Sequence, residues 1–179
     1  MTRIFTDECN AQTPPSLQID FSAALWAINN LNDIFHQAGI PLNDVDFIAE
    51  TDREIIFVEC KNANRVDAAN PDKFFPTKPD KIENVARKYF DSLNFCQFSN
   101  LGVDKRKIYC YLIEAKAGSL LLRNKIRNLL YRKLPFNLQA QNQFPIKMID
   151  DLHVLSFEEW NKMYPQFKLT RLVAPISQN

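Results

Sequence analysis

The chain has 179 residues, of which 46% are hydrophobic and 24% charged, values typical of a globular domain and not of a disordered or fibrous chain. It has three glycines against ten prolines and contains no GxGxxG, GxxxxGKS or GxxxxGKT pattern, which removes the usual support for a Rossmann or P-loop nucleotide site. No apolar run approaches the ~20 residues that span a bilayer, and the first residues lack the basic flank and apolar stretch of a secretory signal. We therefore expect a cytoplasmic protein of one domain over 1–179, with a core over about 20–160, a lead-in at 1–16 and a tail at 165–179.

The formal net charge of +1 hides an uneven distribution along the chain. Residues 1–60 carry two basic and ten acidic side chains, whereas residues 104–134 carry nine basic and two acidic ones. A basic face beside an acidic one is what a phosphate-binding surface next to a metal-binding carboxylate cluster would give. A solvated helix whose charges only keep it in solution gives the same pattern.

A helix and a hairpin are predicted in the first half of the chain. Apolar residues recur at spacings of three and four, which predicts an amphipathic helix over 20–38 that Asp20 caps and Gly39 ends. Residues 46–49 and 55–61 are rich in strand formers and flank a polar stretch, so they predict a β-hairpin.

The second half alternates helices and strands. A loop rich in Asn, Asp and Pro is predicted at 62–77, and a proline opens a helix over 79–95. A nearly continuous apolar run predicts a central strand at 107–115, followed by a basic helix at 119–134 and a last strand at 153–157. This order predicts an α+β fold of α/β/α-like layers, in which helices flank a central mixed sheet that includes the hairpin.

The hairpin brings two acidic residues into register. Side chains alternate between the faces of a strand, so Phe57, Glu59 and Lys61 share one face. Closure through a loop of two or four residues places Asp46 opposite Glu59 on that face. Like charges directly opposite each other destabilise a ladder, unless a cation lies between them or Lys61 neutralises them. The alternative is an ion-pair ladder on the surface of a half-exposed hairpin, which would contribute little.

This arrangement has a chemical use. The carboxylates of Asp46 and Glu59, with the main-chain carbonyl of Cys60, are hard oxygen ligands suited to Mg²⁺ or Mn²⁺. Lys61 lies on the same face and can hold or polarise a water for in-line attack on a phosphodiester. The metal would stabilise the charge that develops on the phosphate and on the leaving oxygen.

At these residues the sequence resembles the PD-(D/E)XK nuclease superfamily. The matching elements are Asp46 at the start of one strand and the run Ile-Ile-Phe-Val-Glu-Cys-Lys-Asn over 55–62 in the next, within a helix and strand order that covers roughly 20–115. The resemblance implies a restriction-endonuclease-like fold, with Asp46 and Glu59 as metal ligands and Lys61 as the catalytic lysine. It also implies metal-dependent hydrolysis of phosphodiester bonds by an endonuclease.

The sequence departs from the family pattern before the aspartate. Only six residues separate Gly39 from Asp46, where the family usually has a further strand, and the family's proline is absent. Other residues are additional candidates for the site. They are Asp20 and Asp33 for an acid of the first helix, Asp44 as a replacement for Asp46, and Lys81 for a polar residue of the following helix.

Basic residues offer contacts for nucleic acid. They are Arg123, Lys125, Arg127, Arg132 and Lys133 in the basic helix, with Lys73 and Lys78 beside the loop. The pair Phe74-Phe75 between these lysines could stack on bases or anchor the loop on the core. We expect DNA rather than RNA as the substrate. An RNA-cleaving toxin or processing enzyme on the same core, and a non-catalytic binding member of the fold, remain alternatives, and a homodimer stays open.

Two further groups of residues are assigned structural roles. Arg87 and Lys88, like Lys81, are interpreted as a solvated face of the second helix. The cysteines form no CxxC pair and have only two histidines as partners, so we expect reduced core residues and no structural zinc site. These cysteines are Cys9, Cys60, Cys96 and Cys110.

Overall fold

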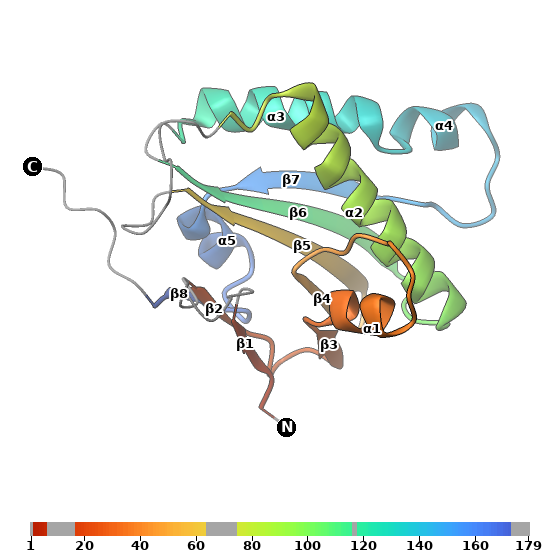
Figure 1. Cartoon of the computed structure of the whole chain (residues 1–179), viewed down its shortest axis with the longest axis horizontal. Coiled ribbons are helices and arrows are strands. Elements are labelled where there is room, and N and C mark those ends of the chain that lie inside the picture. Colours follow the sequence, from red (N-terminus) through yellow and green to blue (C-terminus); the bar gives the residue numbers. More distant parts are fainter. Residues whose placement is uncertain (1, 7–16, 64–74, 116–117, 173–179) are drawn as a thin grey trace, which may run out of the picture.

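A computed structural model describes residues 2–6, 17–63, 75–115 and 118–172. Its centre is a five-stranded mixed sheet in the order β3-β4-β5-β6-β7, with helices on its faces (Figure 1). The α+β fold class predicted from the sequence is therefore confirmed. The strands are β3 (Trp26–Ile28), β4 (Phe47–Glu50), β5 (Glu54–Asn62), β6 (Arg106–Glu114) and β7 (Asp151–Leu155).

The sheet combines an antiparallel and a parallel half. β3, β4 and β5 form an antiparallel meander, whereas β5 pairs with β6, and β6 with β7, in parallel. Parallel neighbours need crossover connections, and these contain α2 (Pro79–Phe98) and α3 (Leu120–Lys133). The predicted central strand is confirmed, because β6 is buried between two neighbours and is apolar along most of its length.

A second, three-stranded sheet lies on the other side of the central sheet from α2 and α3 (Figure 1). It consists of β1 (Ile4–Thr6), β2 (Leu17–Asp20) and β8 (Leu169–Arg171), in the order β1-β2-β8. Helix α5 (Phe157–Met163) contributes to the same core, in which Leu17, Phe167 and Leu169 are buried. The predicted lead-in and tail therefore contain strands, and the core extends beyond 20–160 at both ends.

The predicted helix over 20–38 is wrong. Its first part forms the end of β2, a turn and β3, and only α1 (Leu31–Gln37) is helical. Phe21 packs in the core with the three-stranded sheet, whereas Leu31 and Phe35 pack in the core under α2. A single helix would present one apolar stripe to one core. Here the apolar residues of 20–38 are divided between two cores on opposite faces of the central sheet.

Smaller differences from the predictions occur at the ends of other elements. β7 ends at Leu155 and not at Phe157, because Ser156 and Glu159 form a capping box that begins α5. β5 extends to Asn62, the first residue of the predicted loop, and residues 64–74 of that loop lie outside the described residues. The basic helix is followed by a short helix, α4 (Phe136–Gln141).

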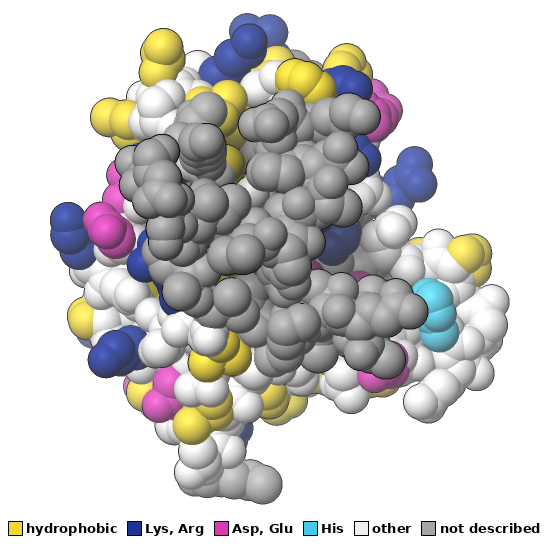
Figure 2. All heavy atoms as spheres, turned by 60° about the vertical axis from the view of Figure 1, so that its left-hand side comes forward, with side chains coloured by type: hydrophobic (Ala, Val, Ile, Leu, Met, Phe, Trp, Pro, Cys, Tyr) yellow, Lys and Arg dark blue, Asp and Glu magenta, His cyan; other side chains and the backbone are white. Residues whose placement is uncertain are grey.

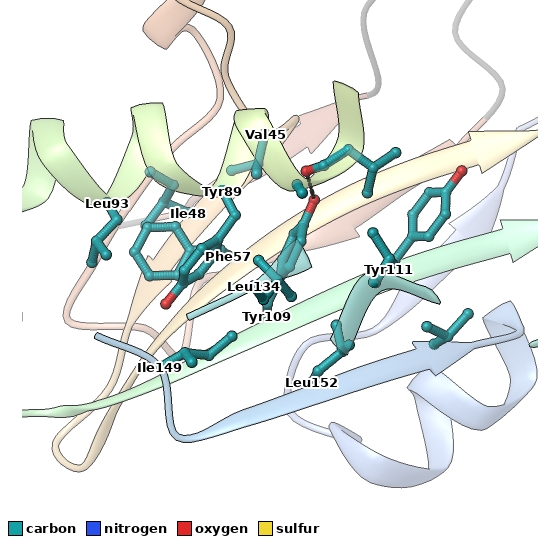
Figure 3. Packing of buried hydrophobic residues seen from close by; sticks show 14 of the residues in the cluster. Val45, Ile48, Phe57, Tyr89, Leu93, Tyr109, Tyr111, Leu134, Ile149 and Leu152 are labelled. Carbon is teal, nitrogen blue, oxygen red and sulfur yellow. Dashed lines mark hydrogen bonds between the residues drawn. The ribbon is translucent and has the colours of Figure 1, made fainter. Parts of the chain in front are cut away.

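Tyrosines join α2 to the central sheet. Tyr89 of α2 packs on Phe57 and Tyr109, with ring centroids 5.1 and 4.9 Å apart (Figure 3). Tyr109 also donates a hydrogen bond of 2.8 Å to the carbonyl of Val85. Both rings are fully buried, so this contact fixes the position of α2 over β5 and β6.

Among the described residues, no helix is long and apolar enough to cross a membrane. Cys96 and Cys110 are buried free thiols, Cys60 is half-buried near the end of β5, and Cys9 lies outside the described residues. Burial raises the pKa of Cys96 to about 12, so this thiol is an inert part of the core.

Candidate active site

The hairpin has the register expected from the sequence. Phe47 pairs with Val58 and Glu50 with Ile55, and Thr51 donates to the carbonyl of Glu54 across the two-residue loop Asp52-Arg53. Ile55 and Phe57 pack in the core under α2, whereas the intervening residues face the other core. By this alternation Asp46 and Glu59 face α2.

The two carboxylates converge on Lys88. Its Nζ lies 2.9 Å from Oε2 of Glu59 and 3.8 Å from Oδ1 of Asp46. The other oxygen of Asp46, Oδ2, accepts a hydrogen bond of 2.6 Å from the main-chain N–H of Cys60. Glu59 is 7% exposed, so this cluster is not the surface ion-pair ladder considered as an alternative.

Helix α2 holds the segment that leads into β4. The hydroxyl of Ser92 accepts a hydrogen bond of 3.0 Å from the N–H of Val45, and Asp91 accepts one of 2.9 Å from the N–H of Asn43. Lys88 lies one turn before Ser92 on the same helix. The segment before β4 and the carboxylate of Asp46 are thus positioned by one stretch of α2.

The cluster has two carboxyl groups and one amine, and this imbalance affects which of the three groups carries a proton. Burial, and then the charge of Asp46, raise the pKa of Glu59 to about 8, although Lys88 opposes this shift. Burial alone would lower the pKa of Lys88, but Glu59 and Asp46 outweigh it and hold that pKa above its ordinary range. Lys88 therefore stays charged, and Glu59 is the group that takes up a proton.

Asp44 has a neighbouring but different place. It is buried, and its Oδ2 accepts a hydrogen bond of 2.7 Å from the N–H of Asn32 in the first turn of α1. Burial raises the pKa of this carboxyl. One oxygen of Asp44 thus stabilises the start of α1.

A pocket of about 170 Å³ lies beside Glu59. It brings together Lys61 and Lys81, two exposed cations that the sequence analysis selected separately. The wall also includes Phe75, which is 52% exposed and whose ring centroid lies 5.1 Å from Nζ of Lys78. The full lining is Glu59, Lys61, Phe75, Pro76, Lys81, Asn84, Val85 and Tyr111.

The candidate acids of the first predicted helix do not join this cluster. Asp20 ends β2 in the three-stranded sheet and accepts a hydrogen bond of 2.8 Å from the N–H of Ser22, so it belongs to no helix. Asp33 is exposed on α1. The prediction of an acid from this region failed because it depended on a helix over 20–38 that does not form.

The basic residues of α3 divide into two sets. Arg123 is buried, forms an ion pair of 2.8 Å with Glu159 and donates to the carbonyl of Gly118, so it serves the fold. Arg127 donates to the carbonyl of Leu152 at 3.0 Å, and Lys133 pairs with Glu83 at 2.7 Å.

Only part of the predicted basic surface is therefore available to a ligand. Lys125 and Arg132 are exposed and lie two turns apart on one side of α3. On the face of the molecule shown in Figure 2, the visible Lys and Arg side chains are spread among hydrophobic and acidic ones. Lys73 and Phe74 lie outside the described residues.

The carboxylate pair can be tested for its fit to a metal. Among the described residues, no group of three or more His, Cys, Asp or Glu side chains gathers. Asp46 and Glu59 nevertheless direct oxygens at one ammonium ion, and Mg²⁺ is commonly bound by one or two carboxylates with water filling its other positions. The donors present fit Mg²⁺ or Mn²⁺, provided that the ammonium of Lys88 moves.

Lys88 is the residue that the sequence analysis missed. It was assigned to a solvated face, but its side chain is 20% exposed and lies between two carboxylates. A signal was present, because Lys88 follows buried Val85 by three positions and precedes buried Ser92 by four. Those spacings place it at the border of the buried stripe of α2.

Comparisons with models of protein families, with curated proteins and with solved structures found no significant match for this chain.

Proposed function

We propose that this protein is a metal-dependent nuclease that hydrolyses phosphodiester bonds, with DNA as the expected substrate. The observation that supports this best is the convergence of Asp46 and Glu59 on one cation beside a pocket that Glu59 and Lys61 line. Paired carboxylates can hold a metal ion, and a lysine next to the same pocket can orient a water, so together they can support metal-assisted hydrolysis of a phosphodiester.

Each residue has a role in this proposal. Asp46 and Glu59 would hold Mg²⁺ or Mn²⁺, with the carbonyl of Cys60 as a further donor, and the metal would supply Lewis-acid stabilisation of the phosphate charge. Lys61 would orient the attacking water from the pocket wall, where it is exposed. Lys81 lines the same pocket and would bind a phosphate oxygen of the substrate.

One wall of the pocket suits a nucleic-acid base. Phe75 is exposed at the pocket and carries Lys78 over its ring, a combination suited to stacking on a base in DNA or in RNA. Two alternatives are therefore kept as outcomes of the test: cleavage of RNA on the same core, and binding of nucleic acid without cleavage.

The test is a cleavage assay with purified protein on supercoiled, linear, branched and single-stranded DNA and on RNA, each with Mg²⁺, Mn²⁺ or EDTA. The Lys61→Ala variant is compared with Lys162→Ala, which removes an exposed lysine from α5. Metal-dependent cutting that Lys61→Ala abolishes and Lys162→Ala retains supports the nuclease, and the preferred substrate gives its class. Binding without cutting of any substrate would favour the non-catalytic alternative.

A further inference from the structure

Lys88 occupies the position between the two carboxylates that a metal would need. We propose that the ammonium of Lys88 and a divalent cation are alternative occupants of the Asp46–Glu59 pair, so that metal binding displaces Lys88. This inference rests on the metal-binding part of the proposed function. Lys88 of α2 would thus occupy the position of the metal until a divalent cation replaces it.

The geometry of the carboxylate pair favours this competition. Nζ of Lys88 donates to Oε2 of Glu59 at 2.9 Å, and Oδ1 of Asp46 lies 3.8 Å from the same nitrogen. Mg²⁺ binds oxygen at about 2.0–2.1 Å and would need the same two carboxylates. A metal and an ammonium held by one pair of side chains would repel each other strongly in a buried cluster, so both do not fit at once.

Lys88 and the two carboxylates belong to different elements of the fold. Asp46 is oriented by the N–H of Cys60 within the hairpin, whereas Lys88 enters from α2. The ammonium can therefore leave by rotation of its own side chain while Asp46 keeps its hydrogen bond to the hairpin. Displacement of Lys88 thus needs no change in the backbone of the hairpin.

The pocket beside Glu59 also lies next to Lys88. Side chains on a helix lean toward its N-terminus, and Asn84 lies one turn before Lys88. Asn84 lines the pocket beside Glu59. A displaced ammonium therefore has this pocket beside it, in which it would meet the phosphate of a bound substrate.

Calorimetric titration with Mn²⁺ at a fixed pH tests the proposal. Lys88→Met is expected to bind Mn²⁺ at least about tenfold more tightly than wild type, because the competing charge is gone. Arg87→Met removes the same charge from the exposed neighbouring position and is expected to bind Mn²⁺ as wild type does. Equal affinity of Lys88→Met and wild type, or no binding by either, would overturn the proposal.

Lys88→Met leaves two carboxylates without a cation in a buried place and can unfold, so a second measurement uses the wild-type protein. The ¹⁵Nζ resonance of Lys88, assigned with Lys88→Arg, is followed by NMR during titration with Mg²⁺. We expect this resonance to shift or to be lost through exchange with water as Mg²⁺ saturates the site. A Lys88 resonance that is unchanged at saturation would show that metal binds without displacing it, and would overturn the proposal.

These outcomes are separable from the proposed function. If the protein cuts nucleic acid only with metal but Lys88 does not respond to Mg²⁺, the nuclease stands and the competition fails. If Lys88→Met binds Mn²⁺ more tightly but no nucleic acid is cut, the competition stands and the nuclease fails.

Discussion

Lys88 donates a hydrogen bond of 2.9 Å to Glu59, a residue 29 positions earlier in the chain. This contact connects α2 to β5 at the same place where the hairpin presents Asp46. Because Glu59 is 7% exposed, the pair is formed away from bulk water, where removal of one partner costs more than the pair contributes. The pair therefore couples the stability of the α2–β5 contact to the state of the candidate site.

Glu59→Gln tests the catalytic assignment. The amide has nearly the same size as the carboxyl group, is uncharged like the protonated carboxyl, and its oxygen can still accept the hydrogen bond from Lys88. The variant is therefore expected to fold with a free energy of unfolding within about 1 kcal/mol of wild type at pH 7. Cleavage is expected to fall by at least about 100-fold, since the amide is a poor metal ligand. Initial rates and urea unfolding measure the two effects.

The matched control is Glu54→Gln in the same strand. Glu54 pairs with exposed Arg106 at 2.9 Å at the loop end of β5, and this variant is expected to cut as wild type does. Wild-type cleavage by folded Glu59→Gln would show that the site assignment is wrong.

The pH dependence of stability follows from the same carboxyl. Burial raises the pKa of Glu59 to about 8, so in the folded protein it keeps a proton that the unfolded chain releases near its ordinary pKa of 4.5. Its contribution to stability is complete below about pH 4.5 and is lost as the pH rises toward 8. The free energy of unfolding of wild type, relative to Glu59→Gln, is therefore expected to fall between pH 5 and 8. Parallel curves from urea unfolding at each pH would contradict this.

Gly102 supports the hairpin from the loop before β6. Its φ is +56°, and a Cβ at this position would lie 2.9 Å from Cβ and Cδ1 of Ile55, which is buried. Gly102→Ala combines a strained backbone with overpacking and is expected to lower the free energy of unfolding by about 2–4 kcal/mol. Gly39→Ala is the control, because Gly39 has a φ of +68° but no atom within 4 Å of the added Cβ. We expect about 1 kcal/mol for it. Equal losses in chemical denaturation would show that contact with Ile55 is not the cause.

The hairpin was predictable because its information is local. Alternation of side chains and the length of one loop determine which residues oppose each other, and the register of Phe47 with Val58 follows from them. Asp46 and Glu59 could therefore be placed on one face without knowledge of the rest of the chain.

The failures share a different cause. The apolar residues in 20–30 have helical spacing. In the structure, however, β3 pairs with the edge of β4, and Phe21 is buried in the second core. Both contacts depend on strands from other parts of the chain. Lys88 was missed for the same reason. A lysine at the border of a buried stripe is ordinarily solvated, and only the packing of α2 on the hairpin brings this one to Glu59.

The buried and the exposed basic residues of α3 are expected to differ in their effect on stability. Arg123 is buried and paired with Glu159, so Arg123→Ala is expected to lower the free energy of unfolding by about 1.5–3 kcal/mol. Lys125 and Arg132 are exposed, and their double change to Ala is expected to alter stability by no more than about 0.5 kcal/mol.

If nucleic acid binds along α3, the double variant has a second effect. The slope of log affinity against log salt is expected to decrease by about 0.9 for each phosphate contact that is lost on a duplex. Fluorescence anisotropy with a labelled duplex between 50 and 200 mM salt measures that slope, with Lys162→Ala on α5 as the control. An unchanged slope in the double variant would place the phosphates elsewhere. The lysines that line the pocket, Lys61 and Lys81, would then be the next to change, because they share that pocket with Glu59.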